Sequence, residues 1–373
     1  MIAGAVGVLV SAIWAGLAAT GFWRTDQRDD LTKKAEPAAW PEVVVVVPAR
    51  NEADVIARSL GSLATQDYPG TFRILLVDDN SEDGTGATAR TIGSDRLTVL
   101  DGKPLPVGWT GKLWALSQGI ERAGSPTWLW LTDADIEHAP DTLRTLVGIA
   151  EAGDRRLVSF MARLHCATWA ERALIPAFVW FFQMLYPFGR VNRPGRTAGA
   201  AGGCVLVRRD ALAAAGGIAA MRGALIDDCT LGALIKTQGP IWLGLTDRSR
   251  SIRPYDTFGA VGRMIARSAY AQLRYSPVLL VGTVAGLALV YLGPPLLALF
   301  GTGLARLGGG VAWLLMAALF QPMLRFYRRS PLWGLAVPAI AAFYSGCTIA
   351  SAWAHARGRG GMWKGRAQAA MNG

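Results

Sequence analysis

Cysteine and histidine are both scarce in this chain of 373 residues. The three histidines show no metal-ligand spacing, and the four cysteines form no close pairs: Cys166, Cys204, Cys229 and Cys347. Neither a zinc site nor a disulfide framework is therefore indicated. The sequence also contains no G-x-x-x-x-G-K-[ST] phosphate-binding loop and suggests no Ser–His–Asp arrangement.

Charged residues are absent from the first 23 residues, MIAGAVGVLVSAIWAGLAATGFW. This stretch is long enough to cross a bilayer, which takes about 20 apolar residues. A cleaved signal peptide is the alternative, but such a peptide normally has a basic start and an Ala-x-Ala-like cleavage site. Because the first charge here is Arg24, we expect a retained transmembrane anchor over residues 1–24.

The C-terminal part of the chain is also largely apolar, and we expect transmembrane segments over residues 278–356, followed by a basic tail over 357–373. Three apolar stretches stand out: 278–300, 311–324 and 332–354. Three full spans after a cytoplasmic domain would leave the basic tail outside, against the charge rule. Either Gly293-Pro294-Pro295 makes one stretch re-entrant or the rule fails here, and the sequence leaves both open.

Acidic residues are outnumbered, 27 against 38 Lys and Arg, which gives a net charge of +11. Nucleic acid is the first partner to consider for such a chain. The basic residues form no single stripe, however, and lie beside the apolar stretches, as in 24–34 and 325–329. This positive-inside pattern predicts a multi-pass protein of the inner (cytoplasmic) membrane, with its globular domain in the cytoplasm and no nucleic-acid partner.

Residues 40–250 have ordinary polarity and alternate strand-like with helix-like segments. The first strand contains five consecutive valines, Val43–Val47, which suit a strand buried on both faces of a parallel sheet. Helical periodicity follows from Asn51, and further strands are expected at 72–77, in RLTVLDG and in TWLWLTDAD. This alternation predicts an open α/β sheet whose ligands lie at the carboxyl ends of the strands.

The stretch GTGATA, residues 84–89, formally matches the dinucleotide fingerprint G-x-G-x-x-A. That fingerprint needs its glycines directly after a strand, so that phosphates reach a helix N-terminus. Here four acidic residues intervene and would repel a pyrophosphate: Asp78, Asp79, Glu82 and Asp83. The sequence therefore does not favour a dinucleotide site.

Three pairs of aspartates each follow an apolar or strand-like segment: Asp78 with Asp79, Asp133 with Asp135, and Asp227 with Asp228. Any one pair has an ordinary explanation, because aspartate is common at turns and helix N-caps. Carboxylates this close repel each other unless a cation lies between them. Mg²⁺ typically uses one or two carboxylates plus substrate phosphates, so the three pairs together favour a metal–diphosphate site.

These motifs, in this order, resemble the family 2 glycosyltransferases of the GT-A fold. The matching stretches lie within about residues 40–240: VVVPARNEADVIARSLGSL, LLVDDNSEDGT, GKLWALSQGI, WLTDADIEHAPDTL, AGGCVLVRRDAL and IDDCTLG. The basic stretch RMIARSAYAQLRYSP, the apolar C-terminal half and the ending GRGGMWKGR resemble in particular the membrane-bound hopene-associated glycosyltransferases. The resemblance implies a Rossmann-like, nucleotide-diphospho-sugar transferase domain of the α/β class, with transmembrane helices on both sides of it.

The resemblance also implies a role for each matching residue. The nucleotide-sugar donor, expected to be a UDP-sugar, would be held by Pro48, Arg50, Asn51, Glu52, Asp78, Asp79, Lys112 and Asp133. Asp133 and Asp135 would bind the Mg²⁺ or Mn²⁺ that bridges the diphosphate. Asp228 would be the catalytic base, with Asp227 as the next candidate.

The implied activity is inverting, metal-dependent transfer of the sugar to a membrane lipid, with a hopanoid-related acceptor expected. A polyprenyl-phosphate or another lipid or polysaccharide acceptor is one alternative, and a catalytically silent scaffold with the GT-A fold is another. The scaffold is disfavoured because Asp133, Asp135 and Asp228 are all present. Processive family members carry Gln-x-x-Arg-Trp after the base, whereas this chain has Gln272, Arg274 and Tyr275 in QLRY, which favours a single transfer.

Residues 251–277 are expected to contain an interfacial amphipathic helix. Its apolar face would meet the bilayer, and Arg263, Arg267 and Arg274 on the other face would meet anionic headgroups. An ordinary surface helix packed on the domain is the alternative. A second apolar segment, 174–188, is expected to be too short to span and either to dip into the headgroup region or to line an acceptor groove.

Overall fold

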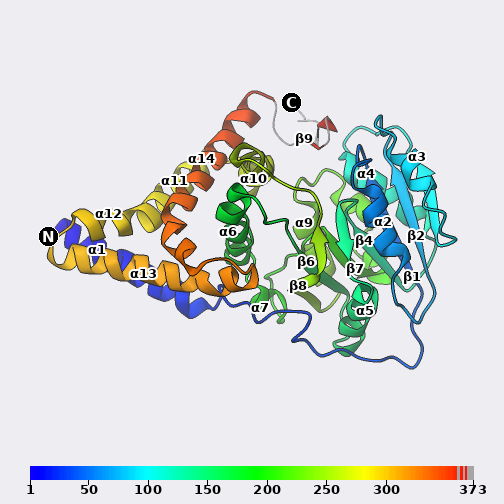
Figure 1. Cartoon of the computed structure of the whole chain (residues 1–373), viewed down its shortest axis with the longest axis horizontal. Coiled ribbons are helices and arrows are strands. Elements are labelled where there is room, and N and C mark those ends of the chain that lie inside the picture. The colour runs from blue at the N-terminus through cyan, green and yellow to red at the C-terminus, as the bar shows by residue number, and fades with distance from the viewer. Residues whose placement is uncertain (359–361, 364–365, 368–373) are drawn as a thin grey trace. The chain divides into compact units, whose positions relative to one another are not determined.

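A computed structural model of the chain describes residues 1–358, 362–363 and 366–367 (Figure 1). The chain forms two compact units. The sheet unit contains Asp26–His165 and Phe188–Pro254, and the helical unit contains Met1–Thr25, Cys166–Pro187 and the segment that begins at Tyr255. Most of the basic tail expected over 357–373 lies outside the described residues, apart from two short paired strands, β9 (Met362–Trp363) and β10 (Arg366–Ala367).

The described part of the sheet unit is built on an eight-stranded sheet with the order β3-β2-β1-β4-β7-β6-β8-β5. The strands are β1 (Val43–Ala49), β2 (Phe72–Asp78), β3 (Leu97–Asp101), β4 (Trp128–Thr132), β5 (Ile136–His138), β6 (Leu157–Arg163), β7 (Cys204–Arg208) and β8 (Ile241–Ser251). The predicted α/β sheet is confirmed, and β3, β2, β1 and β4 run parallel. The other half is mixed, because β7 pairs antiparallel with both β4 and β6.

Helices cover both faces of this sheet. They are α2 (Ile56–Ala64), α3 (Thr85–Arg90), α4 (Gly111–Arg122), α5 (Thr142–Ala152), α7 (Phe188–Val191), α8 (Arg209–Ala214), the 3₁₀ helix η1 (Ile218–Met221) and α9 (Asp227–Lys236). Apolar residues of α2 and α5 pack on one face of β1 and β4. On the opposite face α4 approaches β1 so closely that a side chain at Gly119 would collide with Val46, so a glycine is required there.

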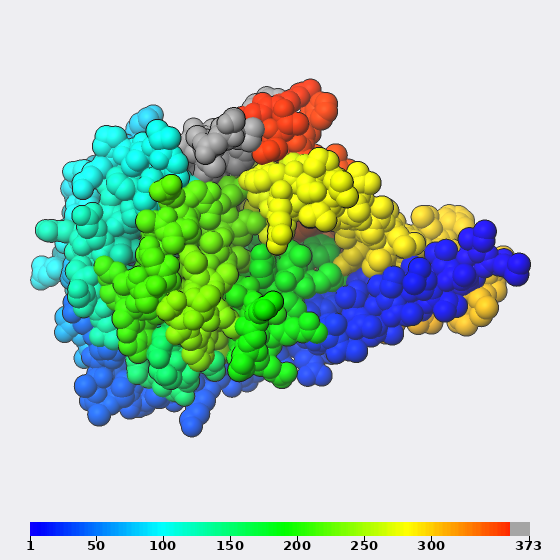
Figure 2. Space-filling view, turned by 180° about the vertical axis from the view of Figure 1, so that it is seen from behind, coloured from blue at the N-terminus to red at the C-terminus, as the bar shows by residue number. Residues whose placement is uncertain are grey.

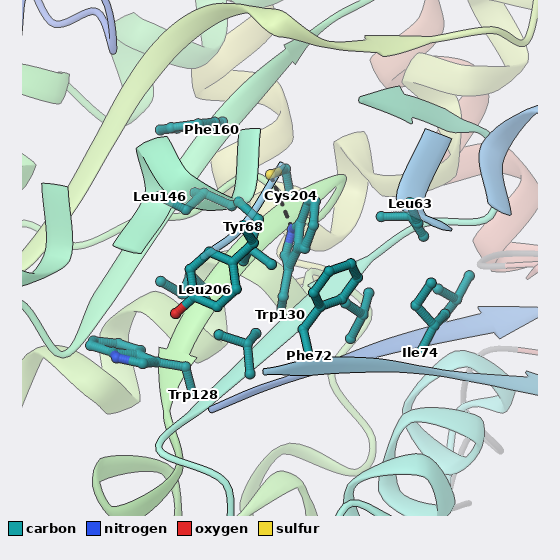
Figure 3. Close-up of a cluster of buried hydrophobic side chains, with 14 of the residues drawn as sticks. Leu63, Tyr68, Phe72, Ile74, Trp128, Trp130, Leu146, Phe160, Cys204 and Leu206 are labelled. Atoms are coloured by element: carbon teal, nitrogen blue, oxygen red, sulfur yellow. Dashed lines mark hydrogen bonds between the residues drawn. The ribbon is translucent and has the colours of Figure 1, made fainter. Parts of the chain in front are cut away.

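Strand β4 explains the run of aromatic and aliphatic residues in WLWLT. Successive side chains of a strand point to opposite faces, so Trp128 and Trp130 join the cluster on the α2/α5 face (Figure 3). The Trp130 indole donates a hydrogen bond to Cys204 Sγ at 3.3 Å. Leu129 and Leu131 are buried on the other face. Burial of a Trp side chain contributes about 4–6 kcal/mol at most by area, so β4 is a firm support for the residues that follow it.

The helical unit contains α1 (Ile2–Thr20), α6 (Trp169–Leu185), α10 (Phe258–Gln272), α11 (Pro277–Leu287), α12 (Gly293–Phe300), α13 (Gly303–Phe326) and α14 (Val337–Ala356). Among the described residues, five segments are long and apolar enough to cross a membrane: Ile2–Thr20, Trp169–Val191, Pro277–Phe300, Gly303–Phe326 and Pro331–Ala356. Side chains of α1 lie open along the face shown in Figure 2. The expectation that 174–188 is too short to span is wrong, because a capping box formed by Thr168 and Glu171 starts this helix at Trp169.

Residues 277–300 stay helical throughout, so the Gly293-Pro294-Pro295 sequence does not reverse the chain. A π-helical turn, Ala288–Leu292, precedes α12. The two prolines follow this turn, at the start of α12, and a π-helical turn is a common place for a helix to absorb such an interruption of its hydrogen bonds. The reversal comes at Gly301–Thr302, after which α13 runs back along α12, with Gly309 against Leu297.

The amphipathic helix expected within 251–277 is shorter than predicted, because α10 covers only Phe258–Gln272. It ends where Arg274 and Tyr275 adopt left-handed backbone conformations, with φ of 52° and 56°, ahead of Pro277. Arg274 therefore does not share the exposed helix face of Arg263 and Arg267.

The apolar face of α10 packs on α14. Val261 and Ile265 are buried, and Gly262 faces Phe343 and Cys347. The backbone N–H of Tyr270 donates to Ser351 Oγ at 3.1 Å. The direct insertion of this apolar face into the bilayer is therefore a wrong expectation, because another helix of the same unit covers it.

The ring of His138 in β5 is buried between β4 and β8. It lies 2.9 Å from Thr132 Oγ1 on one side and 2.9 Å from Ser249 Oγ on the other. Thr132 donates its own proton to Gly203 O, so its oxygen accepts from His138 Nε2–H. Burial lowers the pKa of His138 to about 3, which keeps the ring neutral at physiological pH.

We predict that His138 makes the protein less stable in acid. Between an unfolded pKa of about 6.5 and the native pKa of about 3, only the unfolded chain binds the proton. Stability is therefore full above about pH 6.5 and falls as the pH drops, by about 2 kcal/mol at pH 5. Thermal unfolding of the full chain in detergent, followed by tryptophan fluorescence at pH 7.5 and 5.0, measures this loss. His138→Gln should lose roughly 4–8 °C less over the same interval, and equal losses in the two proteins would refute the prediction.

Candidate functional site

The site lies at the carboxyl ends of β1 and β4, the position predicted from the sequence. Strand β1 pairs in parallel with β2 on one side and β4 on the other, so the strand order reverses there. In open α/β sheets, ligands bind at such a switch point. Pro48 lies near the end of β1, and Asp133 follows β4 directly.

A small pocket opens at this end of the sheet. Its lining residues are Pro48, Lys112, Leu113, Leu116, Leu131, Thr132, Asp133, Gly202, Val205, Ile218, Met221, Asp227, Asp228 and Leu231. The charged groups come from three places that are distant in sequence: the start of α4, the end of β4 and the start of α9. The remaining wall is mostly apolar, which strengthens electrostatic interactions inside the pocket.

Lys112 connects two of the three aspartate pairs. Its Nζ lies 2.9 Å from Asp133 Oδ1 and 3.1 Å from Asp227 Oδ2. Burial by itself would lower the pKa of Lys112, but the carboxylates of Asp133 and Asp227 raise it above its ordinary value, so the ammonium stays charged. A cation of the protein itself thus relieves the repulsion between these carboxylates.

Asp228 lies in the first turn of α9, where negative charge is favoured by the helix dipole. One carboxylate oxygen accepts from Gly202 N at 3.0 Å and the other from Cys229 N at 2.7 Å. Burial and the neighbouring Asp227 raise the pKa of Asp228 to about 6, although Lys112 opposes the rise. A carboxylate with this pKa is suited to general-base work near neutral pH.

The Asp228 hydrogen bond requires a small residue at position 202. A Cβ at Gly202 would lie 3.2 Å from Lys112 Nζ and 3.3 Å from Asp228 Cβ. Both distances are tighter than ordinary van der Waals contact. Gly202 therefore allows the cation and the buried carboxylate to approach the same stretch of backbone.

Asp135 lies outside the pocket lining and pairs with a different cation. Its carboxylate accepts from Arg253 Nε at 3.2 Å, and its backbone O accepts from Ile252 N at 2.9 Å. The Arg253 guanidinium also pairs with Glu52. Each carboxylate of the Asp-x-Asp motif is therefore paired with its own cation.

The loops after β1 and β2 lock together beside the pocket. Arg50 donates to the backbone oxygens of Asp79 and Asn80 at 2.6 and 2.8 Å. The side chain of Asn51, a residue with φ of 51°, accepts from Glu82 N at 2.9 Å. The Glu52 backbone N–H donates to Thr85 Oγ1 at 2.8 Å. In this structure, these groups bind one loop to the other.

The structure thus divides the predicted donor-binding residues into two groups. Pro48, Lys112 and Asp133 line the pocket with Asp227 and Asp228. The others lie in or beside the two interlocked loops at the same end of the sheet: Arg50, Asn51, Glu52, Asp78 and Asp79. Their assignment to a nucleotide stays a prediction.

The described residues contain no group of three His, Cys, Asp or Glu side chains that could hold a metal ion. Asp133 and Asp135 offer carboxylate oxygens, which suit Mg²⁺ or Mn²⁺. Two carboxylates are enough for such an ion only when phosphate oxygens supply further ligands. The residues present therefore fit a metal that is shared with a diphosphate.

The predicted interface residues all belong to the helical unit. Arg263 and Arg267 are exposed on α10. Gln272 Nε2 donates to the Tyr186 hydroxyl at 2.8 Å. Tyr275 stacks on His355 with ring centroids 4.4 Å apart. Their proposed role towards an acceptor or headgroup is not tested by these contacts.

Sequence reasoning missed Arg253 and Gly202. Arg253 is 118 residues from Asp135, and no local pattern distinguishes it from neighbouring arginines. Gly202 stands in AGGCV, within a stretch already matched to the family, and the pair of glycines before a buried strand was the available signal.

Comparison with known proteins gives a family match for the sheet-containing part of the chain. Residues 44–216 match the sequence model of Glycosyl transferase family 2. This part of the chain, just under half of it, is therefore similar to family 2 glycosyltransferases. The narrower resemblance to hopene-associated enzymes stays a prediction.

Curated relatives match parts of the chain. It is 28% identical over 193 residues to a beta-monoglucosyldiacylglycerol synthase of Trichormus variabilis, covering 50% of this chain and 39% of that protein. It is 28% identical over 156 residues to a 4,4'-diaponeurosporenoate glycosyltransferase of Staphylococcus aureus, covering 40% of each. The chain thus spans less than half the length of these relatives.

A solved structure matches nearly the whole chain. It is a mannosyltransferase from Pyrobaculum calidifontis in complex with GDP-Man and Mn²⁺, with 20% identity and a TM-score of 0.58. The match covers 94% of this chain and 99% of that chain. At this identity the likeness concerns the fold, and it confirms the GT-A architecture expected from the sequence.

We predict that Lys112 stabilises the fold of the glycosyltransferase domain. Lys112→Met should destabilise the protein by about 2 kcal/mol, less than the roughly 3–5 kcal/mol of a fully buried pair, because Asp133 is 35% exposed. In thermal unfolding, Lys112→Met/Asp227→Asn should recover part of the loss. If the two single changes were simply additive in the double variant, the pair would not be coupled.

Proposed function

We propose that this protein is an inverting, metal-dependent glycosyltransferase that moves a sugar from a nucleotide-diphosphate donor to a hydroxyl of a membrane lipid. The observation that carries the proposal is the position of Lys112, which joins Asp133 of the donor motif to Asp227, next to the base, in one pocket. Donor diphosphate and acceptor hydroxyl would thereby meet at the same place. The match to family 2 supports the same reaction class.

In the proposed mechanism, Asp228 removes the proton of the acceptor hydroxyl as its oxygen attacks the anomeric carbon. The bond from that carbon to the diphosphate breaks on the opposite side, which inverts the anomeric centre. The hydrogen bonds from Gly202 N and Cys229 N orient the Asp228 carboxylate. Asp133 and Asp135 would hold the Mg²⁺ or Mn²⁺, and that ion would supply Lewis-acid stabilisation of the leaving group.

The proposed acceptor is a lipid because the described part of the chain contains five segments long and apolar enough to cross a membrane. One relative is also named as a synthase of a glucosyldiacylglycerol. The apolar wall of the pocket suits such an acceptor. We propose that the domain lies on the cytoplasmic side of the inner membrane, and the basic residues beside the apolar segments support this orientation. Arg263 and Arg267 on the exposed face of α10 would then contact anionic headgroups, and a hopanoid-related acceptor is the finer part of the proposal.

The function can be tested by incubating the purified full chain with labelled UDP- and GDP-sugars and membrane lipid extract, and by identifying the glycolipid formed. Acceptors to compare are diacylglycerol, a hopanoid alcohol and a polyprenyl phosphate. Label that enters polyprenyl phosphate would assign the alternative acceptor. No labelled product with any donor and acceptor would contradict the proposed function.

Asp228→Asn should lower kcat by about 10²–10⁴-fold, because general-base catalysis contributes that much, while donor affinity changes little. In the wild type, kcat/KM should fall below about pH 6, where the raised pKa leaves the Asp228 carboxyl protonated and unable to accept a proton. Initial rates and donor titrations from pH 5 to 8 measure both effects. A normal rate for Asp228→Asn would move the base elsewhere, with Asp227 next.

Removal of divalent metal by a chelator tests whether transfer depends on a metal ion. EDTA should silence transfer until excess Mg²⁺ or Mn²⁺ is added, because without the metal the negative Asp133 and Asp135 carboxylates would repel the departing diphosphate instead of stabilising it. Asp135→Asn should abolish transfer, whereas Asp210→Asn, a change to an exposed carboxylate paired with Arg208, should leave transfer intact. Full activity in chelator would disprove metal dependence.

A further inference from the structure

Arg253 connects three acidic side chains at the edge of the proposed donor site. It lies two residues after the end of β8. The backbone N–H of the preceding residue, Ile252, donates a hydrogen bond to Asp135 O at 2.9 Å. Its guanidinium donates to Asp135 Oδ2 at 3.2 Å, pairs with Glu52, and lies 3.9 Å from Asp54 Oδ2. The loops after β1 and β4 are therefore bridged by one cation from the far end of the domain.

We infer that Arg253 is a resident cation on Asp135 that a divalent metal must displace, so that metal binds tightly only together with the donor diphosphate. This inference rests on the proposed function, because it takes Asp135 as a metal ligand. It assigns Arg253 a positioning role that neither the family match nor the sequence gives it. Arg253 then sets the order in which the site is filled.

The charges around Arg253 explain why the metal would need the diphosphate in order to bind tightly. A metal on the Asp135 carboxylate would meet the guanidinium at the same oxygen atoms, and the two cations would repel each other. Displacement of the guanidinium by a metal alone would also leave the carboxylate of Glu52, only 9% exposed, without this cation. Unpaired buried charge is costly. A metal without a diphosphate therefore binds weakly.

A diphosphate offsets these two costs. It supplies further oxygen ligands to the metal, and its phosphate oxygens accept the planar, forked donors of a guanidinium well. Lys112 is placed in the same way, because its ammonium holds Asp133. Both cations can transfer from carboxylate to phosphate when the donor arrives. By linkage, nucleotide and metal then strengthen each other's binding by the same factor.

Mn²⁺ binding to the full chain in detergent tests the inference without any transfer reaction. The loss of the free Mn²⁺ signal in electron paramagnetic resonance gives the affinity for Mn²⁺ alone, and then with UDP or GDP. For the wild type, one nucleotide should tighten Mn²⁺ binding at least tenfold, within the roughly 5–150-fold range of coupled sites. For Arg253→Gln, Mn²⁺ alone should bind about tenfold tighter than to the wild type, and the nucleotide effect should shrink.

Matched variants show whether the change in Mn²⁺ affinity comes from the pairing of Arg253 with Asp135. Arg250→Gln removes an exposed arginine of the same strand and should bind Mn²⁺ as the wild type does. Arg253→Gln/Asp135→Asn should return to weak binding, because the carboxylate is gone. Arg253→Lys keeps the positive charge but loses the forked donors that reach Asp135 through Nε and Glu52 through Nη2. It should bind Mn²⁺ alone several-fold tighter, which keeps the test decisive if Arg253→Gln does not fold.

If folded Arg253→Gln or Arg253→Lys bound Mn²⁺ alone no more tightly than the wild type does, the inference would be overturned. Arg253 would then have only a structural role, in connecting the two loops. Tight binding of Mn²⁺ alone to the wild type would overturn it too. The proposed function is tested separately, in the transfer assay, where it would be contradicted if the wild type transferred sugar from none of the donors. Metal affinity of the Arg253 variants does not depend on that result.

Discussion

The ammonium group of Lys112 is the interaction on which the site depends. Without it, Asp133, Asp227 and Asp228 would place three carboxylates around one small pocket with a mostly apolar wall. The position of the ammonium is set by α4, whose approach to β1 is possible because Gly119 has no side chain to meet Val46. The packing of α4 on β1 therefore fixes the position of the positive charge at the carboxyl ends of β1 and β4.

The sheet gives the acidic residues a rigid support. Asp133 follows a strand whose two tryptophans and two leucines are buried on opposite faces, so its backbone cannot shift without disturbing both layers. The loops after β1 and β2 are joined by the Arg50 guanidinium. The backbone that carries Asp133 is therefore fixed before a ligand arrives, and groups fixed in advance need little reorganisation when it binds, which is a main electrostatic contribution of many enzyme sites.

Local patterns in the sequence predicted the parts of the fold that depend on local forces. The valine run Val43–Val47 and the alternation in WLWLT gave the buried parallel strands, and the position of Asp133 at a strand end followed from them. The pairing of Arg253 with Asp135 could not be predicted from the sequence, because it depends on the pairing of β8 with β5. The antiparallel entry of β7 and the covering of α10 by α14 likewise arise from tertiary contacts that no single segment encodes.

The position of β8 at the end of the domain has a consequence for biosynthesis. Strand β5, made early, pairs only with β8 in the described sheet, through Ile136 and Ser251. Arg248 of β8 also pairs with Asp29 and Asp141. Roughly 115 residues separate the start of β5 from the end of β8, so a ribosome adding about 5–20 residues per second leaves β5 without its partner strand for about 6–23 s. The apolar first helix is already made by then, so membrane-targeting factors and chaperones can engage the nascent chain while the sheet is still incomplete.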